Sequence, residues 1–279
     1  METTLRLEAI LMFDYHMHSH FSPDASMAME DAIKTSISKG LTEICFTDHL
    51  DYDYDGQGND ISFDWPSYLE HINKLQQKYS GQIVIKKGVE FGLQPHILDK
   101  YEKDVSNLDL DFIIASIHSV EKHDLYEGNY FDDKDQSKAY LNYFQSLYDM
   151  LHHYEQYSVL GHLDVIKRYG HYDILLPFEA FEEVTRAILK LVIEKGRGIE
   201  LNTSGIRYQL GDYHPSLDIL KVYRELGGEI ITLGSDSHTQ NQIAFDFPNA
   251  LKALESIGFK YISSFDKMKP SFHRIDHLL

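Results

Sequence analysis

Short apolar segments alternate with amphipathic segments along the whole chain, and this alternation limits the folds that the chain can adopt. The apolar segments are rich in β-branched residues, as are strands buried on both faces of a parallel sheet. We expect seven such strands, at residues 13–18, 43–48, 83–91, 111–118, 158–162, 198–202 and 229–235. Helices are expected at residues 27–39, 65–79, 96–108, 135–154, 177–195, 215–226 and 243–257, and a weaker strand at 261–264. The alternation predicts an α/β fold with a parallel sheet.

Polar side chains of the types that bind metals occur at the carboxyl ends of the expected strands. They are His16, His18, Asp48, His49, Glu90, His118, His162, Asp164, Asn202, Asp236 and His238, with Asp24 in the loop after the first strand. An open sheet concentrates its site at one switch point, whereas a barrel gathers the ends of all its strands at one mouth. We therefore expect residues 1–279 to form a single domain, a closed or nearly closed β/α barrel, with metal motifs spanning residues 16–238.

Three histidines alternate at the end of the first expected strand, at His16, His18 and His20. Side chains two residues apart lie on the same face of a strand, so all three are expected to point to one side. Alternating imidazoles near a carboxylate suit zinc, manganese or iron. Solvated histidines on a polar strand edge are the alternative, and the recurrence of ligand types at the other strand ends argues against it.

Composition excludes several classes of protein. The formal charge is −18, from 44 acidic and 26 basic residues, which disfavours non-specific binding to nucleic acid or to anionic membranes. No apolar run approaches the roughly 20 residues of a membrane span, and Met1–Phe13 lacks the apolar core of a signal peptide. The single cysteine, Cys45, allows no disulfide within the chain and fits a reducing, cytoplasmic compartment.

Six short motifs, in order, resemble those of the polymerase-and-histidinol-phosphatase metallohydrolase family. They are His16-x-His18, Thr47-Asp48-His49, Gly88-x-Glu90, Ser116-Ile117-His118, Gly161-His162-x-Asp164 and Gly234-Ser235-Asp236-x-His238. The resemblance implies a distorted seven-stranded barrel that holds three divalent metal ions (zinc, manganese or iron) and hydrolyses phosphate esters. Clustered divalent cations neutralise phosphoryl oxygens and lower the pKa of a bound water, so no protein nucleophile is required.

The resemblance also assigns ligands to the three metals. It implies His16, His18, Glu90 and Asp236 for the first metal, a bridging Glu90 with His118 and His162 for the second, and Asp24, His49 and His238 for the third. Many relatives carry histidine in the place of Asp24, so an aspartate there predicts a harder and weaker third site.

Other polar residues near these motifs are candidates for catalysis or substrate binding. His20 is either a group that contacts phosphate or the leaving oxygen, or a solvated histidine. Asp48 and Asp164 stand beside ligands and are expected to orient them. Arg168 and Arg207 follow the fifth and sixth strands, where a guanidinium suits a phosphate dianion, and Asn202 ends the sixth strand. Surface salt bridges are the alternative for both arginines.

The local sequences around Arg168 and Arg207 resemble those of the histidinol-phosphatase branch of the family. That branch implies hydrolysis of L-histidinol phosphate in histidine biosynthesis, a small-molecule substrate and no nucleic-acid or membrane partner. The alternatives are a phosphoesterase acting on nucleotides or other small phosphomonoesters, and a non-catalytic metal-binding barrel. The oligomeric state stays open.

Two segments imitate metal sites. Residues 51–56 begin like a calcium loop, but position twelve falls on Ser62 instead of glutamate. We expect residues 50–64 to form a loop over the mouth, with Trp65 packed beneath it. The tyrosine-rich helix at 138–157, with His152 and His153, is expected to be a packing surface.

Overall fold

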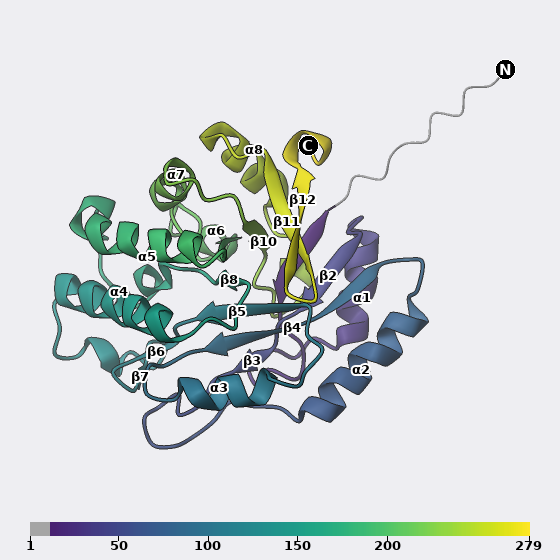
Figure 1. The fold of residues 1–279 in the computed structure, drawn as a ribbon, viewed down its shortest axis with the longest axis horizontal. Helices are drawn as coiled ribbons and strands as arrows, with labels where there is room; N and C mark the ends of the chain where they lie inside the picture. Colours follow the sequence, from purple (N-terminus) through teal and green to yellow (C-terminus); the bar gives the residue numbers. More distant parts are fainter. Residues whose placement is uncertain (1–11) are drawn as a thin grey trace.

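The structure is a computed structural model that describes residues 12–279, and its centre is a parallel sheet curled into a nearly closed barrel (Figure 1). The seven strands of the barrel, in spatial order, are β1 (Phe13–Met17), β2 (Glu43–Phe46), β4 (Val84–Gly92), β5 (Phe112–Ser116), β8 (Val159–Leu160), β9 (Gly198–Asn202) and β10 (Ile231–Gly234). The two outer strands approach each other beyond their ends: His18 N–H donates to the Ser237 carbonyl (2.8 Å) and Asp236 N–H to the His16 carbonyl (2.8 Å). The predicted distorted TIM-like (β/α)7 barrel is therefore confirmed.

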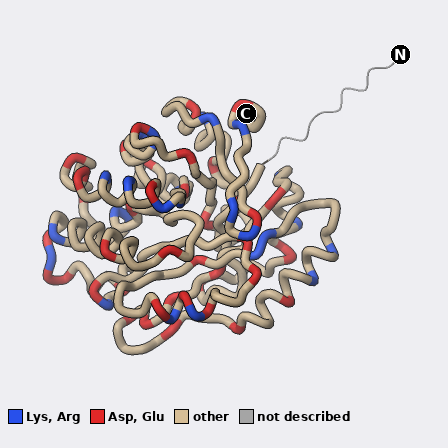
Figure 2. The backbone as a smooth tube through the Cα atoms, viewed as in Figure 1, with Lys and Arg blue, Asp and Glu red and all other residues tan. Residues whose placement is uncertain are grey.

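Helices pack around the outside of this barrel (Figure 1). The α-helices are α1 (Met29–Ser38), α2 (Trp65–Lys78), α3 (Leu98–Val105), α4 (Gln136–His153), α5 (Glu182–Glu194), α6 (Ser204–Arg207), α7 (Leu217–Glu225) and α8 (Phe247–Ile257). Helix α2 begins where Asp64 accepts the Ser67 N–H, and α4 begins where Asp135 accepts the Lys138 N–H. Helix α8 ends at Gly258, whose φ of 101° suits glycine. Lys and Arg are interspersed with Asp and Glu along these helices (Figure 2).

Short elements fill the connections. They are the strands β3 (His49–Leu50), β6 (Ser119–Val120) and β7 (His123–Asp124), and the 3-10 helices η1 (Asn129–Phe131), η2 (Val165–Arg168), η3 (Phe178–Ala180), η4 (Gln240–Gln242) and η5 (Ile275–His277). The strand expected at 43–48 is split, because β2 ends at Phe46 and β3 pairs separately with β4. No helix in residues 12–279 is long and apolar enough to cross a membrane.

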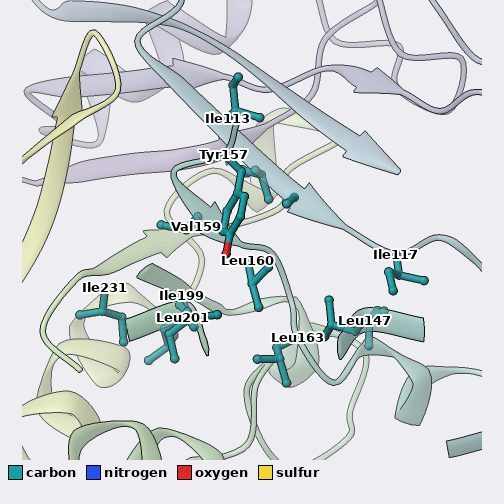
Figure 3. Close-up of a cluster of buried hydrophobic side chains, with 14 of the residues drawn as sticks. Ile113, Ile117, Leu147, Tyr157, Val159, Leu160, Leu163, Ile199, Leu201 and Ile231 are labelled. Atoms are coloured by element: carbon teal, nitrogen blue, oxygen red, sulfur yellow. The ribbon is translucent and has the colours of Figure 1, made fainter. Parts of the chain in front are cut away.

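Branched aliphatic side chains from neighbouring strands form part of the main hydrophobic core (Figure 3). Ile113, Val159, Leu160, Ile199, Leu201 and Ile231 are all buried, and they belong to the same hydrophobic cluster as Leu147 and Leu163 (Figure 3). Burying each such side chain contributes about 1.5–3 kcal/mol relative to leaving it exposed. The polar ends of these strands therefore extend from a well-packed hydrophobic core.

The segment expected as a weak eighth strand does not join the barrel. It forms β11 (Tyr261–Asp266), which pairs with β12 (Lys269–Arg274) in an antiparallel hairpin. The hairpin covers the amino-terminal ends of the barrel strands: Tyr15 donates its hydroxyl to the Phe265 carbonyl (3.1 Å), and Met268 N–H donates to the Asp111 carbonyl (2.9 Å). The opposite end, where the carboxyl ends of the strands meet, stays available for a site.

Candidate metal centre

Glu90 lies at the centre of the side chains that gather at the mouth of the barrel. It is buried, and its two carboxylate oxygens face different histidines. Oε2 lies 3.1 Å from His16 Nε2, 3.5 Å from His18 Nε2 and 3.2 Å from His49 Nδ1. Oε1 lies 2.8 Å from His162 Nε2 and 3.3 Å from His118 Nε2. A carboxylate divided in this way can bridge two metal ions.

The backbone explains why His49 reaches Glu90. The chain breaks from β2 after Phe46 and pairs again at β3, where His49 is the direct partner of Glu90 on β4. His49 therefore stands beside the central carboxylate, with Nδ1 towards Glu90 and Nε2 towards Asp24 (3.6 Å).

Two further groups complete the cluster. Asp236 Oδ1 lies 3.3 Å from His18 Nε2 and 3.7 Å from His16 Nε2, on the same side as Glu90 Oε2. Asp24 Oδ2 lies 3.0 Å from His238 Nε2, and its side chain is 53% exposed, the most open of the set. The structure thus brings together all nine residues that the sequence predicted as metal ligands.

The donor set fits metal ions and fits poorly as a packed core. His16 Nε2 and His18 Nε2 are 3.1 Å apart and both rings are buried, while His49 Nδ1 is buried without a hydrogen-bond partner. Sets of donor atoms within 4.8 Å of one another include His16, His18 and Asp236, and His16, Glu90 and His162. Imidazole and carboxylate donors at this spacing suit zinc, manganese or iron.

Nearby histidines keep two buried carboxylates of the cluster, Glu90 and Asp236, ionised. Burial opposes ionisation of Glu90, but His16, His118 and His162 outweigh it and hold the pKa of this carboxyl well below its usual range. The pKa of Asp236 is likewise well below its usual range, because His16 and His18 outweigh the effect of burial. Both groups are therefore negatively charged at neutral pH.

Two acidic residues that the sequence reasoning did not select hold the histidine ligands. Glu200 Oε1 lies 2.6 Å from His16 Nδ1, and Asp51 Oδ2 lies 2.7 Å from His118 Nδ1. Such contacts fix the orientation of a metal-binding imidazole. The signal for Glu200 is a carboxylate within an apolar strand, two residues before Asn202 and therefore on the same face. Asp51 gives no comparable signal, because it begins an acidic loop.

Asp48 contacts the cluster through a serine. It accepts hydrogen bonds from Ser19 N–H (2.6 Å) and from the Ser22 hydroxyl (2.9 Å), and Ser22 Oγ also lies 3.2 Å from His18 Nδ1. Asp48 therefore stabilises the turn after β1 and reaches His18 only through Ser22.

Asp164 is placed differently from the expectation that it orients an adjacent metal ligand. Its carboxylate accepts from Lys167 Nζ (2.9 Å) and Ser216 N–H (2.9 Å), and it lies 2.9 Å from His214 Nδ1. Asp164 thus ties η2 to the segment before α7. These three contacts take the place of the expected contact with a ligand.

His20 does not share the face of His16 and His18. Strand β1 ends at Met17, so the alternation of side chains stops before His20. The His20 ring is exposed and lies 4.7 Å from the Phe21 ring and 5.6 Å from the His71 ring of α2, between ring centroids. The expectation that all three histidines point to one side is therefore wrong.

The other three residues proposed for substrate binding, besides His20, differ in whether their polar groups already have partners. The Arg168 guanidinium stacks on Tyr208 (3.4 Å to the ring centroid) and forms no ion pair within residues 12–279. Arg207 instead donates to the carbonyls of Ser235 (2.7 Å) and Asp236 (2.8 Å). Asn202 donates to Glu200 Oε2 (3.2 Å) and accepts the Ser204 N–H (2.9 Å). Arg207 and Asn202 thus support the loop and the ligands.

In the acidic loop that imitates a calcium site, Asp53 and Asp55 accept hydrogen bonds from backbone N–H groups of the loop itself. Asp53 accepts the Gly58 N–H (2.7 Å) and Asp55 accepts the Gln57 N–H (2.9 Å). Trp65 packs against Phe63, with ring centroids 4.9 Å apart. The Ser119 hydroxyl donates to the Tyr54 carbonyl (2.6 Å), and this hydrogen bond holds the acidic loop against β6.

Fold and site together define a β/α barrel whose mouth carries a cluster of histidines and carboxylates able to hold several metal ions. The model of the PHP domain matches residues 14–204, more than half of the chain. The chain belongs to the PHP domain family, as the six motifs predicted.

Proteins of known name are similar over nearly the whole chain. The histidinol-phosphatase of Lactococcus lactis is 33% identical over 258 residues, covering 92% of this chain and 95% of the relative. A Clostridium acetobutylicum protein named probable histidinol-phosphatase is 31% identical over 251 residues, covering 90% and 95%. The crystal structure of the Lactococcus lactis histidinol phosphate phosphatase, complexed with zinc, L-histidinol and phosphate, has a TM-score of 0.85 at 31% identity, covering 93% of this chain and 98% of that one.

Proposed function

We propose that this protein is a metal-dependent phosphomonoesterase that hydrolyses L-histidinol phosphate to L-histidinol and phosphate, a step in histidine biosynthesis. The observation that carries the proposal is the Glu90-centred cluster, which lies at the mouth of a barrel matching the zinc-, histidinol- and phosphate-bound Lactococcus lactis enzyme with a TM-score of 0.85. The reaction breaks the bond between phosphorus and the ester oxygen, and water supplies the new oxygen on phosphorus and the proton on L-histidinol.

The metal set belongs to the proposal. His16, His18, Glu90 and Asp236 would hold one ion, Glu90, His118 and His162 a second, and Asp24, His49 and His238 a third. When bound, divalent cations neutralise the phosphoryl oxygens and activate water. The buried and mutually close donors support several ions, and the exposed Asp24 supports a weaker third site. Zinc is the first candidate, with manganese and iron as alternatives.

Side chains of this chain supply orientation and charge. Glu200 and Asp51 fix the imidazoles of His16 and His118. The guanidinium of Arg168, free of ion pairs within the described residues, is available to a phosphate oxygen. A net charge of −18 favours a substrate with a cationic amine and disfavours nucleic acid, so a small-molecule partner is proposed. The single buried Cys45 supports a cytoplasmic location.

A panel of phosphate monoesters tests the substrate. The protein loaded with zinc or manganese is assayed for phosphate release from L-histidinol phosphate, p-nitrophenyl phosphate and nucleoside monophosphates. We expect kcat/KM to be highest for L-histidinol phosphate, and we expect Asp236→Ala to abolish activity while the protein stays folded. Hydrolysis of p-nitrophenyl phosphate that is no slower than that of L-histidinol phosphate would refute the substrate, and faster hydrolysis of nucleotides would identify the alternative.

Elemental analysis tests the metal content separately. The proposal expects about three ions per chain, falling by one in Asp24→Ala. A count of one ion per chain in the fully loaded protein would contradict the ligand sets. A folded protein that binds the ions and hydrolyses none of the esters would be a non-catalytic barrel.

A further inference from the structure

A second hollow lies at the end of the barrel opposite the metal cluster. It has a volume of about 570 Å³, within the range of small-molecule sites. Its walls come from segments that precede strands: the α3–β5 connection, the α4–β8 connection and the α5–β9 connection, together with the turn of the β11–β12 hairpin. Because these segments meet at the amino-terminal ends of the strands, this hollow is separate from the proposed active site.

Arg197 is the cationic side chain of this hollow, and its position is unusual. It stands one residue before β9, with its guanidinium carbon 5.7 Å from the centroid of the Tyr157 ring. Its Nε is buried without a hydrogen-bond partner, and within residues 12–279 no carboxylate pairs with it. Glu155, which also lines the hollow, is instead paired with Lys195 (2.9 Å). Because Arg197 lines the hollow and no carboxylate within residues 12–279 neutralises its guanidinium, a ligand carboxylate in the hollow could pair with it.

The remaining walls carry a negative charge and an aliphatic surface. Glu102 of α3 lines the hollow, is half-buried and forms no ion pair within the described part of the chain. Leu108, Leu110, Ile113 and Met268 supply apolar surface between the charged groups. One cation, one anion and an aliphatic wall are complementary to a molecule with a carboxylate, an ammonium group and an apolar side chain.

We propose that this hollow binds an aliphatic α-amino acid, with its carboxylate on Arg197 and its ammonium group towards Glu102. The hollow shares no residue with the metal cluster, so this binding is independent of the proposed phosphatase activity.

Calorimetric titration of the zinc-loaded full chain with L-leucine tests the proposal. Two partial probes separate the charged contacts: 4-methylpentanoate has only the carboxylate, and 3-methylbutylamine has only the ammonium group. We expect one L-leucine per chain and binding of each partial probe weaker by about tenfold or more, since each loses a hydrogen bond to a charged group. Absence of L-leucine binding, or binding of 4-methylpentanoate as tight as that of L-leucine, would overturn the proposal.

Matched variants locate the binding. Arg197→Met should abolish L-leucine binding, whereas Arg186→Met, at a half-buried arginine of α5 that does not line the hollow, should leave it unchanged. Glu102→Gln should weaken L-leucine and leave 4-methylpentanoate unaffected, which keeps the test decisive even if Arg197→Met fails to fold. Phosphate release is measured in parallel, and all three variants should retain it. Binding of L-leucine that persists in folded Arg197→Met would assign it to the metal centre and refute this site.

Discussion

The Glu200 carboxylate lies 2.6 Å from His16 Nδ1, and both side chains are buried at the mouth of the barrel. The other oxygen of Glu200 accepts the His162 backbone N–H (2.9 Å), so one carboxylate connects two strand ends that carry metal ligands. The approach is close because Gly234, on the neighbouring strand, has no side chain: a Cβ there would collide with Glu200 Oε1 and the His16 Cβ. Glu200 therefore turns the Nε2 atom of His16 towards Glu90.

Replacing this carboxylate should weaken metal binding without removing a ligand. We expect Glu200→Gln to lower zinc affinity by roughly 10- to 100-fold, the range typical of residues that orient metal-binding histidines. Competition with a chelator measures the affinity. The matched control is Glu194→Gln, at the exposed end of α5, which should leave zinc affinity unchanged. An equal affinity in Glu200→Gln and the wild type would show that His16 needs no such partner.

Replacing Asp51 should also weaken zinc binding, in this case through His118. Its Oδ2 lies 2.7 Å from His118 Nδ1, and its Oδ1 accepts the Gly92 N–H (2.8 Å), so the carboxylate is fixed at both ends. We expect Asp51→Asn to reduce the zinc content and the phosphatase activity together, and excess zinc to restore part of the activity.

The neighbouring Asp53 offers a control for Asp51 in the same loop. Its contacts are with His96 (2.8 Å) and Gly58, away from the cluster. Asp53→Asn should leave zinc content and activity as in the wild type. If both variants lose zinc equally, the loop as a whole supports the site and Asp51 has no special part.

The clustering of the residues proposed as metal ligands was predictable from the sequence, because strand alternation and barrel topology place them with little reference to other side chains. His16, His18 and Glu90 each end an apolar segment, and a parallel barrel brings such ends to one mouth. Contacts between distant segments were not predictable: the Glu200–His16 pair joins residues 184 positions apart, and the bonds from Arg207 to Ser235 and Asp236 depend on the paths of two loops. His20 was misplaced because the alternation of side chains was extended beyond the strand, which ends at Met17.

The two arginines of the mouth should respond differently to substitution. Arg168 is held only by aromatic stacking, so Arg168→Met should raise KM for the phosphate ester by about tenfold or more and barely change Tm. Arg207 holds two carbonyls next to the ligand Asp236, so Arg207→Met should lower Tm and zinc affinity. Steady-state kinetics and thermal unfolding of the two variants distinguish these effects, and a fall in Tm for Arg168→Met alone would reverse the assignment.

His214 makes the stability of the fold depend on pH through a histidine that is not one of the proposed metal ligands. Burial and the nearby Lys167 lower the pKa of His214 to about 4, against the opposing effect of Asp164. The unfolded chain, with an ordinary value of 6.5, therefore binds this proton more readily than the folded chain does. Between these two values the contribution of His214 to the free energy of unfolding rises with pH, and it is largest above 6.5. The shift corresponds to about 3 kcal/mol over that window.

Metal-depleted protein shows this effect without competition from metal binding. Urea unfolding at a series of pH values from about 4 to 7 gives the free energy of unfolding directly. We expect His214→Asn to be less stable than the wild type at pH 7, and to lose less stability on acidification, by about 3 kcal/mol. His152→Asn, at an exposed position on α4, should follow the wild-type curve. Parallel curves for His214→Asn and the wild type would mean that the protonation of other groups governs acid unfolding.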